Sequence, residues 1–352
     1  MRRPSPLPTL AELRAIAAGH GIEHVGVAPA DVLTRARGAL HERKAAGLHG
    51  GMSFTYRNPD RSSDPQRALA GARSVVVAAR SYLAAEEPRR PEGAVARVAR
   101  YAWVDHYEPL RVGLRAMARR LREAGERAAP FADDNSMVDR EIAHRAGLGW
   151  FGKNANLLLP GAGSWFVLGS VVTTAELPVD EPVADGCGPC RRCVDACPTG
   201  AIVAPGVVDA NRCLAWVLQR PGSIEPSLRP AVGDRIYGCD DCQEVCPPTV
   251  HLGRRHERPL DTDAEAWVDV LDLLAADDAT LLARHGRWYI AERDPRWLRR
   301  NALVVLGNTA DPADERVVAT LARYRGHDDP ILAEHARWAS DRLGIGIDAT
   351  AP

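Results

Sequence analysis

All eight cysteines of this 352-residue chain lie between Cys187 and Cys246, and this segment constrains the fold more than any other. The first four follow at short intervals as Cys-x2-Cys-x2-Cys-x3-Cys-Pro. The second four begin with a lone cysteine and end, after a long gap, in Cys-x2-Cys-x3-Cys-Pro. This is the spacing of bacterial two-cluster ferredoxins, written twice. The segment therefore predicts two [4Fe–4S] clusters.

The spacing also predicts which cysteines share a cluster. Three thiolates from one tight loop bind three corners of a cube, and the cysteine before each proline must reach the other cluster. Cluster one is assigned to Cys187, Cys190, Cys193 and Cys246, and cluster two to Cys197, Cys213, Cys239 and Cys242. Zinc ribbons normally lack the Cys-x3-Cys-Pro extension, and disulfides suit short secreted chains. Both alternatives therefore fit less well.

The net charge and the first residues of the chain indicate where in the cell the protein is expected. The net charge of -1 gives no general indication of a nucleic-acid or membrane partner, and no apolar run is long enough to span a bilayer. Arg2 and Arg3 would suit a twin-arginine signal, but Pro4 and Pro6 follow instead of an apolar stretch. We expect a cytoplasmic protein of two or three domains that does not contact a membrane.

Helical and extended patterns alternate in the first 180 residues. Thr9 and Glu12 form a capping box ahead of a first helix. Further helices are predicted over 31–46 and 107–121, and strands over 24–28, 74–78 and 165–172. This alternation predicts an α/β domain over 1–180.

Two segments of this domain have the composition of binding loops. Residues 50–57 combine paired glycines with aromatic and basic residues, which a plain surface turn also explains. Residues 132–154 begin with the acids Asp133 and Asp134 and end in a glycine-rich Gly-Lys-Asn stretch. The P-loop spacing is absent, but the glycines would let backbone N–H groups approach a large ligand. By pattern alone, the two acids would be a helix N-cap and a spare charge.

Between the two cysteine sets, residues 209–238 contain Trp216 and Ile236, whose side chains need burial. We therefore expect this linker to contact clusters and ligands rather than to be a solvated connection.

Helical patterns take over beyond residue 260. Asp-Pro pairs begin at 294, 311 and 329, each typical of an N-cap and the first helical residue. Glycines at 307, 326 and 344 are typical of helix ends. The repetition predicts a short HEAT-like α-solenoid that packs on the ferredoxin part.

Arginines gather in this C-terminal part. Arg296, Arg299 and Arg300 share one helix face by their spacing. Further basic and aromatic residues near them in sequence are Arg254, Arg255, His256, Arg284, Arg287 and Trp288. A solvated charged face is the usual explanation, and a local phosphate-binding surface is the alternative.

Several motifs together match one known family. They are Arg100 to Trp103, Asp139 to Asn154, Gly233 to Gln243, Arg300 to Leu303 and Leu306 to Asn308, together with both cysteine sets. Through them the chain resembles, over nearly its whole length, the epoxyqueuosine reductases, which are cobalamin-dependent iron–sulfur enzymes of tRNA modification. The double ferredoxin motif alone is unspecific, whereas this combination is specific.

The resemblance implies a multidomain α+β protein. It implies a domain over 1–180 that binds cob(II)alamin without a side chain on the cobalt, a ferredoxin-like two-cluster domain over 181–255, and a HEAT-like tRNA-binding domain over 256–352. The clusters would reduce cobalamin one electron at a time. The substrate would be epoxyqueuosine at the wobble position of a tRNA anticodon, reduced to queuosine with loss of water. The partners would be that tRNA and a low-potential electron donor, and we expect a monomer.

The resemblance also implies site residues. The family's proton donor aligns with Asp133, but Asp134 follows where the family has Thr or Ser, so either acid is a candidate. Candidate cobalamin contacts are Arg57, Tyr101, Asp133, Lys153, Asn154 and Ser164, and candidate tRNA contacts are Arg296, Arg299 and Arg300. An opening epoxide builds negative charge on oxygen, and burial or a second carboxylate would raise the pKa of an acid that protonates it.

Two other functions stay open. One is a reductive-dehalogenase-like corrinoid reductase of a small molecule, although those enzymes usually carry an export signal and lack a helical nucleic-acid module. The other is an electron carrier without catalysis, against which the large N-terminal domain argues.

Overall fold

The computed structural model describes residues 5–54, 56–252 and 258–346, and in it the chain forms two units that are each built from separate segments. Unit 1 comprises Met1–Glu86, Asp105–Asp209 and Asp241–Asp261. Unit 2 comprises Glu87–Val104, Ala210–Asp240 and Thr262–Pro352. The units do not follow the three consecutive segments expected from the sequence, because the cysteine segment contributes to both. The functional division into 1–180, 181–255 and 256–352 stays a prediction.

A four-stranded sheet in the order β1-β2-β7-β4 forms the centre of unit 1. Its strands are β1 (His24–Pro29), β2 (Ser74–Ser81), β7 (Phe166–Thr173) and β4 (Ala128–Ala132). Every neighbouring pair is antiparallel. The predicted mixture of helices and strands is confirmed, but alternation of helices and strands does not determine strand direction, and the sheet is not the parallel one typical of α/β domains.

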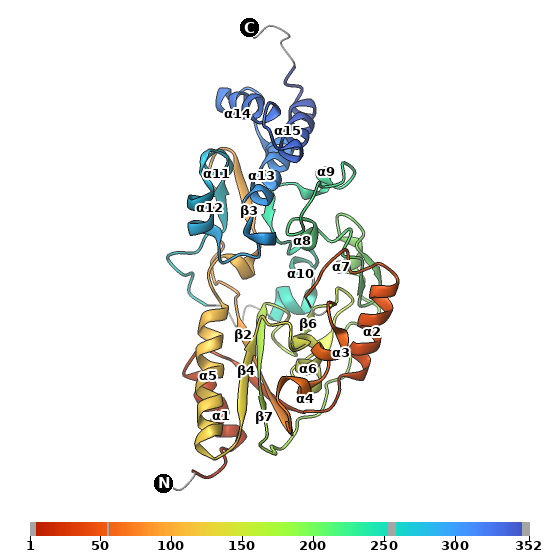
Figure 1. The fold of residues 1–352 in the computed structure, drawn as a ribbon, viewed down its shortest axis with the longest axis vertical. Coiled ribbons are helices and arrows are strands. Elements are labelled where there is room, and N and C mark those ends of the chain that lie inside the picture. Colours follow the sequence, from red (N-terminus) through yellow and green to blue (C-terminus); the bar gives the residue numbers. More distant parts are fainter. Residues whose placement is uncertain (1–4, 55, 253–257, 347–352) are drawn as a thin grey trace. The chain divides into compact units, whose positions relative to one another are not determined.

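Helices cover both faces of this sheet (Figure 1). Helices α1 (Leu10–Ala18) and α5 (Tyr107–Glu123) lie on one face, and α1 begins with the predicted capping box. On the other face, Val75 and Val77 of β2 pack with Ile142 of α6 (Asp139–Arg145). Burial from both sides explains why the sequence of β2 is almost continuously apolar.

Apart from helix α2 (Thr34–Ala45), the remaining elements of unit 1 are short. Helices α2, α3 (Pro59–Ser62) and α4 (Pro65–Ala68) follow β1, and the hairpins are β5 (Trp150–Phe151) with β6 (Leu157–Leu158) and β8 (Ile202–Ala204) with β9 (Val207–Val208). The cysteine loops carry α7 (Arg192–Asp195), α10 (Asp241–Glu244) and the π-helix η2 (Pro248–Leu252). These turns and hairpins position the candidate site.

Unit 2 contains a three-stranded sheet and helices. Strand β3 (Val95–Val98) lies between β10 (Arg235–Tyr237), which is parallel to it, and β11 (Trp267–Asp269), which is antiparallel. Its helical segments are η1 (Arg100–Ala102), α8 (Leu214–Val217), α9 (Arg229–Val232), α11 (Val270–Ala275), α12 (Asp278–His285), η4 (Ala291–Arg293), α13 (Arg296–Thr309), α14 (Glu315–Arg325) and α15 (Pro330–Leu343). Trp216 and Ile236 are buried, as the sequence predicts.

The starts of the three C-terminal helices only partly follow the Asp-Pro pairs. Asp329 caps α15, accepting hydrogen bonds from the N–H groups of Ile331 and Leu332, as predicted. Helix α14 instead begins after Asp314, so the prediction is wrong for Asp311, whose carboxylate closes a turn by accepting from the Ala313 N–H. Asp294 lies one residue before the N-cap of α13 and accepts from the Arg296 N–H.

The three glycines of this part have different roles. Gly344 ends α15 in the left-handed conformation, with φ of 67°, and Gly326 ends α14, both as predicted. Gly307 lies inside α13 and does not end it. A Cβ atom there would come within 2.7 Å of the Trp338 ring and 2.8 Å of the Ala339 Cα in α15. Gly307 therefore allows α13 and α15 to approach closely.

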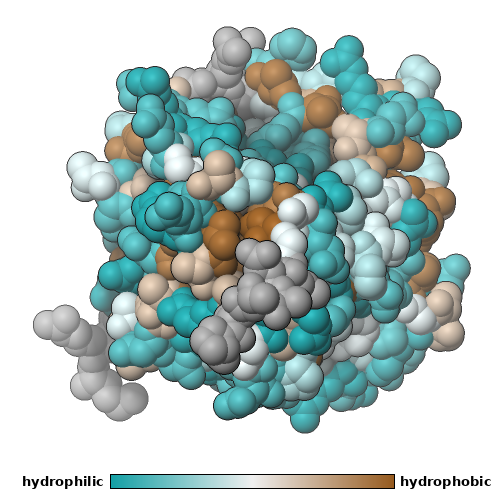
Figure 2. Space-filling model, turned by 90° about the horizontal axis from the view of Figure 1, so that it is seen from above, coloured by the Kyte–Doolittle hydropathy of each residue, from teal (hydrophilic) through white to brown (hydrophobic). Residues whose placement is uncertain are grey.

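In the described part of the chain, no helix is both long and apolar enough to cross a membrane. Figure 2 shows one face, on which hydrophilic residues predominate around small apolar patches. Scattered apolar surface of this kind is ordinary in soluble folds and carries no functional argument.

Candidate functional site

Four cysteines of unit 1 line one cavity of about 440 Å³. They are Cys187, Cys190, Cys193 and Cys246, the set that the sequence assigns to cluster one. Cys246 comes from the second cysteine set, so the structure brings together the crossed combination. Burial raises the pKa of the Cys193 thiol, and the neighbouring cysteines raise it further. Four cysteine sulfurs around one cavity fit a cationic iron–sulfur core, since cysteine thiolates are its usual ligands.

The cysteines are all free thiols, so the disulfide alternative finds no support. Within the described residues, no three His, Cys, Asp or Glu side chains are grouped to ligate a single ion. Of the predicted ligands of cluster two, Cys197 and Cys242 belong to unit 1, and Cys213 and Cys239 belong to unit 2. Their grouping stays a prediction.

The glycine-rich segment predicted to approach a ligand, Gly147 to Asn154, runs through β5 and ends in the loop of the β5–β6 hairpin, residues 152–156. The loop closes through hydrogen bonds from the Gly152 N–H to the Asn156 carbonyl (2.8 Å) and from the Ala155 N–H to the Gly152 carbonyl (2.9 Å). Ala155 has φ of 62°, which is costly for a residue with a Cβ atom. The hairpin therefore presents its side chains in one defined conformation.

Lys153 and Asn154 of this loop contact the cysteine segments. The Lys153 ammonium donates to the carbonyl oxygens of Gly188 (2.7 Å) and Cys190 (2.9 Å). The buried Asn154 amide donates to the carbonyl oxygen of Cys242 (3.2 Å). Both residues were predicted to contact cobalamin, which stays a prediction. Their polar groups are engaged in holding the cysteine loops.

Ser164 is buried, and its hydroxyl donates to the Gln243 side-chain carbonyl (2.9 Å) and lies 3.1 Å from the Thr249 hydroxyl. It therefore holds the second cysteine segment from inside. The predicted contact between Ser164 and cobalamin stays a prediction. Of the other predicted contacts, Arg57 is exposed, and Tyr101 belongs to unit 2, where its hydroxyl accepts a hydrogen bond from the Gln219 amide (3.0 Å).

Asp133 follows β4 on an exposed loop, with φ of 54°. Although the residue is exposed as a whole, nearby protein atoms desolvate its carboxyl group, and this raises its pKa. Arg111 lowers the pKa in part, and the carboxylates of Asp134 and Asp105 raise it again. Burial and a second carboxylate are the two causes anticipated from the sequence.

Asp134 has a different role from the one its pattern suggests. Its carboxylate accepts a hydrogen bond from the Ser136 N–H (2.7 Å) and closes a local turn. The N-cap of α6 is Val138, which makes no side-chain cap, so the N-cap prediction for the acid pair is wrong. Asp134 itself is exposed.

A third acid of this region, Asp139 in the first turn of α6, was not predicted as a site residue from the sequence. Burial, and then the charge of Asp133, raises the pKa of Asp139 to about 8. The pKa of the nearby Tyr107 hydroxyl is also raised, first by its own burial and then by the charges of Asp133 and Asp139. The available signal was a lone acid directly after the apolar Met137 and Val138, which indicates partial burial. Asp133 and Asp139 are thus two acids whose pKa values are both raised, that of Asp139 to about 8.

The predicted phosphate-binding arginines are mostly engaged within unit 2. Arg300 is fully buried, and its guanidinium donates to the carbonyl oxygens of Arg220 (2.8 Å) and Gly222 (2.6 Å). The prediction of a tRNA contact is therefore wrong for Arg300. Arg299 forms an ion pair with Asp278, and only 13% of its side chain is exposed. Arg296 pairs with Asp294 and Asp329 but keeps 43% of its side chain exposed.

Other members of the predicted basic set also have structural roles. Trp288 is buried and stacks on Tyr237, with ring centroids 4.7 Å apart, and Arg287 donates to the Trp103 carbonyl (2.9 Å). Arg284 is exposed. Arg254, Arg255 and His256 lie outside the described residues.

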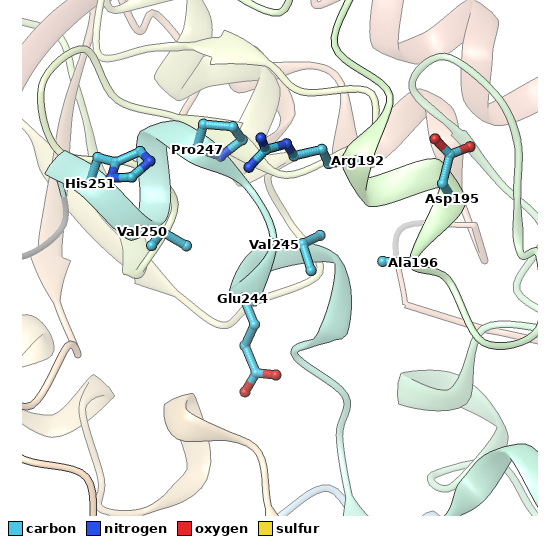
Figure 3. A pocket seen from close by; sticks show the side chains of 8 residues that line it. All are labelled: Arg192, Asp195, Ala196, Glu244, Val245, Pro247, Val250 and His251. Carbon is cyan, nitrogen blue, oxygen red and sulfur yellow. The ribbon is translucent and has the colours of Figure 1, made fainter.

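A groove of about 480 Å³ lies next to the cysteine cavity (Figure 3). Arg192, Asp195 and Ala196 form one wall, and residues between Glu244 and His251 form the other. Pro247 and His251 line both the groove and the cavity. In Figure 3, the Arg192 side chain extends toward Pro247, and the Glu244 carboxylate points away from the other labelled side chains. Cluster one would therefore lie close to this surface of unit 1.

Comparison with known proteins agrees with this geometry. Residues 186–249 match the 4Fe-4S double cluster binding domain, and residues 62–139 match the family described as Epoxyqueuosine reductase QueG, DUF1730. An epoxyqueuosine reductase of Xanthomonas campestris pv. campestris is 35% identical over 98% of this chain and 99% of its own length. This chain belongs to the epoxyqueuosine reductase family. The epoxyqueuosine reductase of Escherichia coli K12 is 34% identical over 91% of this chain and 85% of its own.

Solved epoxyqueuosine reductases have the same fold. One, crystallised with an epoxyqueuosine-modified tRNA-Tyr stem loop, has a TM-score of 0.86 and 28% identity, over 95% of this chain and 90% of that chain. A Bacillus subtilis epoxyqueuosine reductase, whose catalytic aspartate loop is swung out of the active site, has a TM-score of 0.85 and 27% identity over the same shares. The family assignment makes this protein an oxidoreductase and decides against the electron-carrier and dehalogenase-like alternatives.

Proposed function

We propose that this protein reduces epoxyqueuosine at the wobble position of a tRNA anticodon to queuosine. The observation that carries the proposal is the match to an epoxyqueuosine reductase over almost the full length of both chains. The cavity lined by four thiols supports it, because a reductase of this kind needs a route for electrons. The tRNA substrate is supported by the structural relative that holds a modified tRNA stem loop.

The proposal includes two kinds of cofactor. Two [4Fe–4S] clusters would be held by the eight cysteines in the crossed arrangement, and would pass electrons singly from an external low-potential donor. Bound cobalamin would supply a strongly reducing cobalt centre. Arg57 and Asp133 are both exposed, so such a ligand could reach them, which supports assigning its site to the N-terminal α/β part. The helices α13 to α15 would form the HEAT-like, tRNA-binding part.

Asp133 is the proposed proton donor. When the carbon–oxygen bond of the epoxide opens, the oxygen gains negative charge and needs a proton. Burial, followed by the neighbouring acids Asp134 and Asp105, raises the pKa of the Asp133 carboxyl group, which favours the protonated form that can donate. Arg111, whose charge opposes the shift, would stabilise the carboxylate that remains after transfer. Reduction by two electrons and two protons then gives the alkene of queuosine and water.

Nucleoside analysis tests the proposal. Cells that lack this protein should accumulate epoxyqueuosine in their tRNA, detected by mass spectrometry, and the intact chain should restore queuosine. A variant with Cys190→Ser should not restore it. Normal queuosine in the deleted strain, or restoration by the cysteine variant, would overturn the proposal.

A further inference from the structure

The β5–β6 hairpin loop touches both cysteine sets within unit 1. Lys153 donates to two carbonyl oxygens of the first set, at Gly188 and Cys190, and it lines the cavity of the four cluster-one cysteines. On the other side of the loop, the Asn156 amide lies 4.0 Å from the Cys242 sulfur as a hydrogen-bond donor. Cys242 is assigned to cluster two. One five-residue loop thus contacts a ligand segment of each cluster.

Lysine is rare in this chain, so a lysine at position 153 is unusual. Of 45 lysines and arginines, only Lys44 and Lys153 are lysines. A lysine ammonium is a compact point charge with three donors, whereas a guanidinium is a broad planar group. A compact cation fits between two carbonyl oxygens that lie 2.7 Å and 2.9 Å from its nitrogen. The position therefore combines a positive charge with a hydrogen-bonded anchor on the cysteine loop.

Charge and hydrogen bonds are two established determinants of cluster potential. A [4Fe–4S] cluster becomes more negative by one charge when it is reduced, so a nearby cation favours the reduced form. A hydrogen bond to a ligand sulfur also favours the reduced form, because it stabilises the extra electron density on that sulfur. Lys153 is placed to act as the nearby cation, and Asn156 is placed to donate the hydrogen bond to a ligand sulfur.

We propose that the β5–β6 hairpin loop sets the reduction potentials of the two clusters separately, Lys153 raising that of cluster one and Asn156 raising that of cluster two. The inference rests on the proposed function, since it requires both clusters to be present. Lys153 acts through the cluster and touches no substrate, so it is a positioning residue. Asn154, whose amide donates to the Cys242 carbonyl, holds the loop against the second cysteine segment.

Redox titration of anaerobically purified holoprotein, followed by electron paramagnetic resonance, tests this. Lys153→Met and Lys153→Gln should each lower the equilibrium constant for one-electron reduction of one cluster about tenfold, which equals a shift of about 59 mV to more negative potential. Lys153→Arg keeps the charge and should stay near the wild type. Asn156→Leu should shift the other cluster in the same direction. Lys44→Met is the matched control, since Lys44 contacts only the Tyr56 carbonyl among the described groups, and should change neither.

Iron and sulfide content per chain separates the possible failures. A wild-type protein without eight irons would contradict the proposed function itself. With full iron, unchanged potentials in Lys153→Met and Lys153→Gln would overturn the inference. A wild-type potential in Lys153→Gln alone would also overturn it, because glutamine can still donate to a carbonyl but carries no charge. If Lys153→Met loses iron, Lys153→Gln and Lys153→Arg still provide the comparison.

Discussion

The charge of Asp133 raises the pKa of the Asp139 carboxyl group, which burial has already raised. Two acids six positions apart in sequence, one on a loop and one in the first turn of α6, thus share a poorly solvated environment. Because Asp139 holds a proton up to a pH of about 8, it adds no negative charge beside Asp133 at neutral pH. Pairs of acids with separated pKa values are common where a proton is to be transferred.

Replacing Asp133 with Asn should abolish most turnover while leaving binding intact. Asparagine keeps the shape of the side chain and removes the transferable proton. General acid catalysis contributes a factor of about 10²–10⁴, so the rate of epoxyqueuosine reduction should fall by that order. The measurement is anaerobic turnover with a strong chemical reductant, together with tRNA affinity and iron content.

Asp134→Asn is the control for this experiment, because Asp134 is exposed and its carboxylate closes a local turn with Ser136. It should retain most activity. Loss of turnover in Asp134→Asn with near-normal Asp133→Asn would reverse the two roles. Normal turnover in both variants would mean that the proton comes from another group.

Asp139 should make the protein less stable as the pH rises. Its folded-state pKa is about 8, well above the value of about 3.9 for an unfolded aspartate, so the folded state binds more protons between these values. The stabilisation from this group is full below about pH 4 and is lost as the pH rises toward 8.

Asp139→Asn stays neutral, so its stability relative to the wild type should increase from pH 5 to about pH 9. Midpoints of chemical unfolding across this range provide the measurement. Parallel pH profiles for the two proteins would show that Asp139 is charged when folded.

Local patterns in the sequence predict the elements of the fold well. The capping box at Thr9, the apolar run from Ser74 and the periodic helix from Tyr107 all appear where expected, because each depends on residues close together in the chain. Strand direction in the sheet depends on distant pairings and was not predictable in this way. Gly307 shows the same limit: only the approach of Trp338 from another helix reveals why glycine is needed.

For the candidate site, too, the sequence predicts what depends on local spacing but not what depends on distant contacts. Cysteine spacing is set by cluster geometry, so Cys246 could be assigned to the first set before its position was known. Helical spacing places Arg296 and Arg300 on one face but does not tell which side of the helix is buried, and Arg300 lies inside. The partners of Lys153 are backbone carbonyls, which leave no side-chain signature in a sequence.

Arg300→Met should destabilise unit 2 without directly removing a tRNA contact. The methionine fills part of the volume but leaves the carbonyl oxygens of Arg220 and Gly222 without this donor. An unsatisfied buried group costs about 1–3 kcal/mol, and because both carbonyls are only partly buried, a total loss of about 1–3 kcal/mol in unfolding free energy is expected. Denaturant unfolding measures it, and a loss below about 1 kcal/mol would mean that water or a neighbour replaces the guanidinium.

Arg296→Met is the matched variant on the same helix. Its side chain is 43% exposed and paired with two partly exposed carboxylates, and ion pairs of exposed cations contribute only about 0–1 kcal/mol. If Arg296 also contacts a phosphate, the variant should bind tRNA more weakly at low salt, and the slope of log affinity against log salt should decrease by about one. An unchanged slope would remove Arg296 from the tRNA-binding surface.

Cys197→Ser should damage cluster two, although Cys197 belongs to the first cysteine set. The four thiols around the cavity in unit 1 are those of Cys187, Cys190, Cys193 and Cys246, and this set is complete without Cys197. The Cys197 sulfur instead accepts a hydrogen bond from the Ala201 N–H (3.2 Å). The variant should lose up to about four irons while one cluster keeps its wild-type spectrum and potential. Cys246→Ser is the reciprocal test, and it should damage cluster one despite its place in the second set. If instead each variant damages the cluster of its own sequence set, the ligands do not cross.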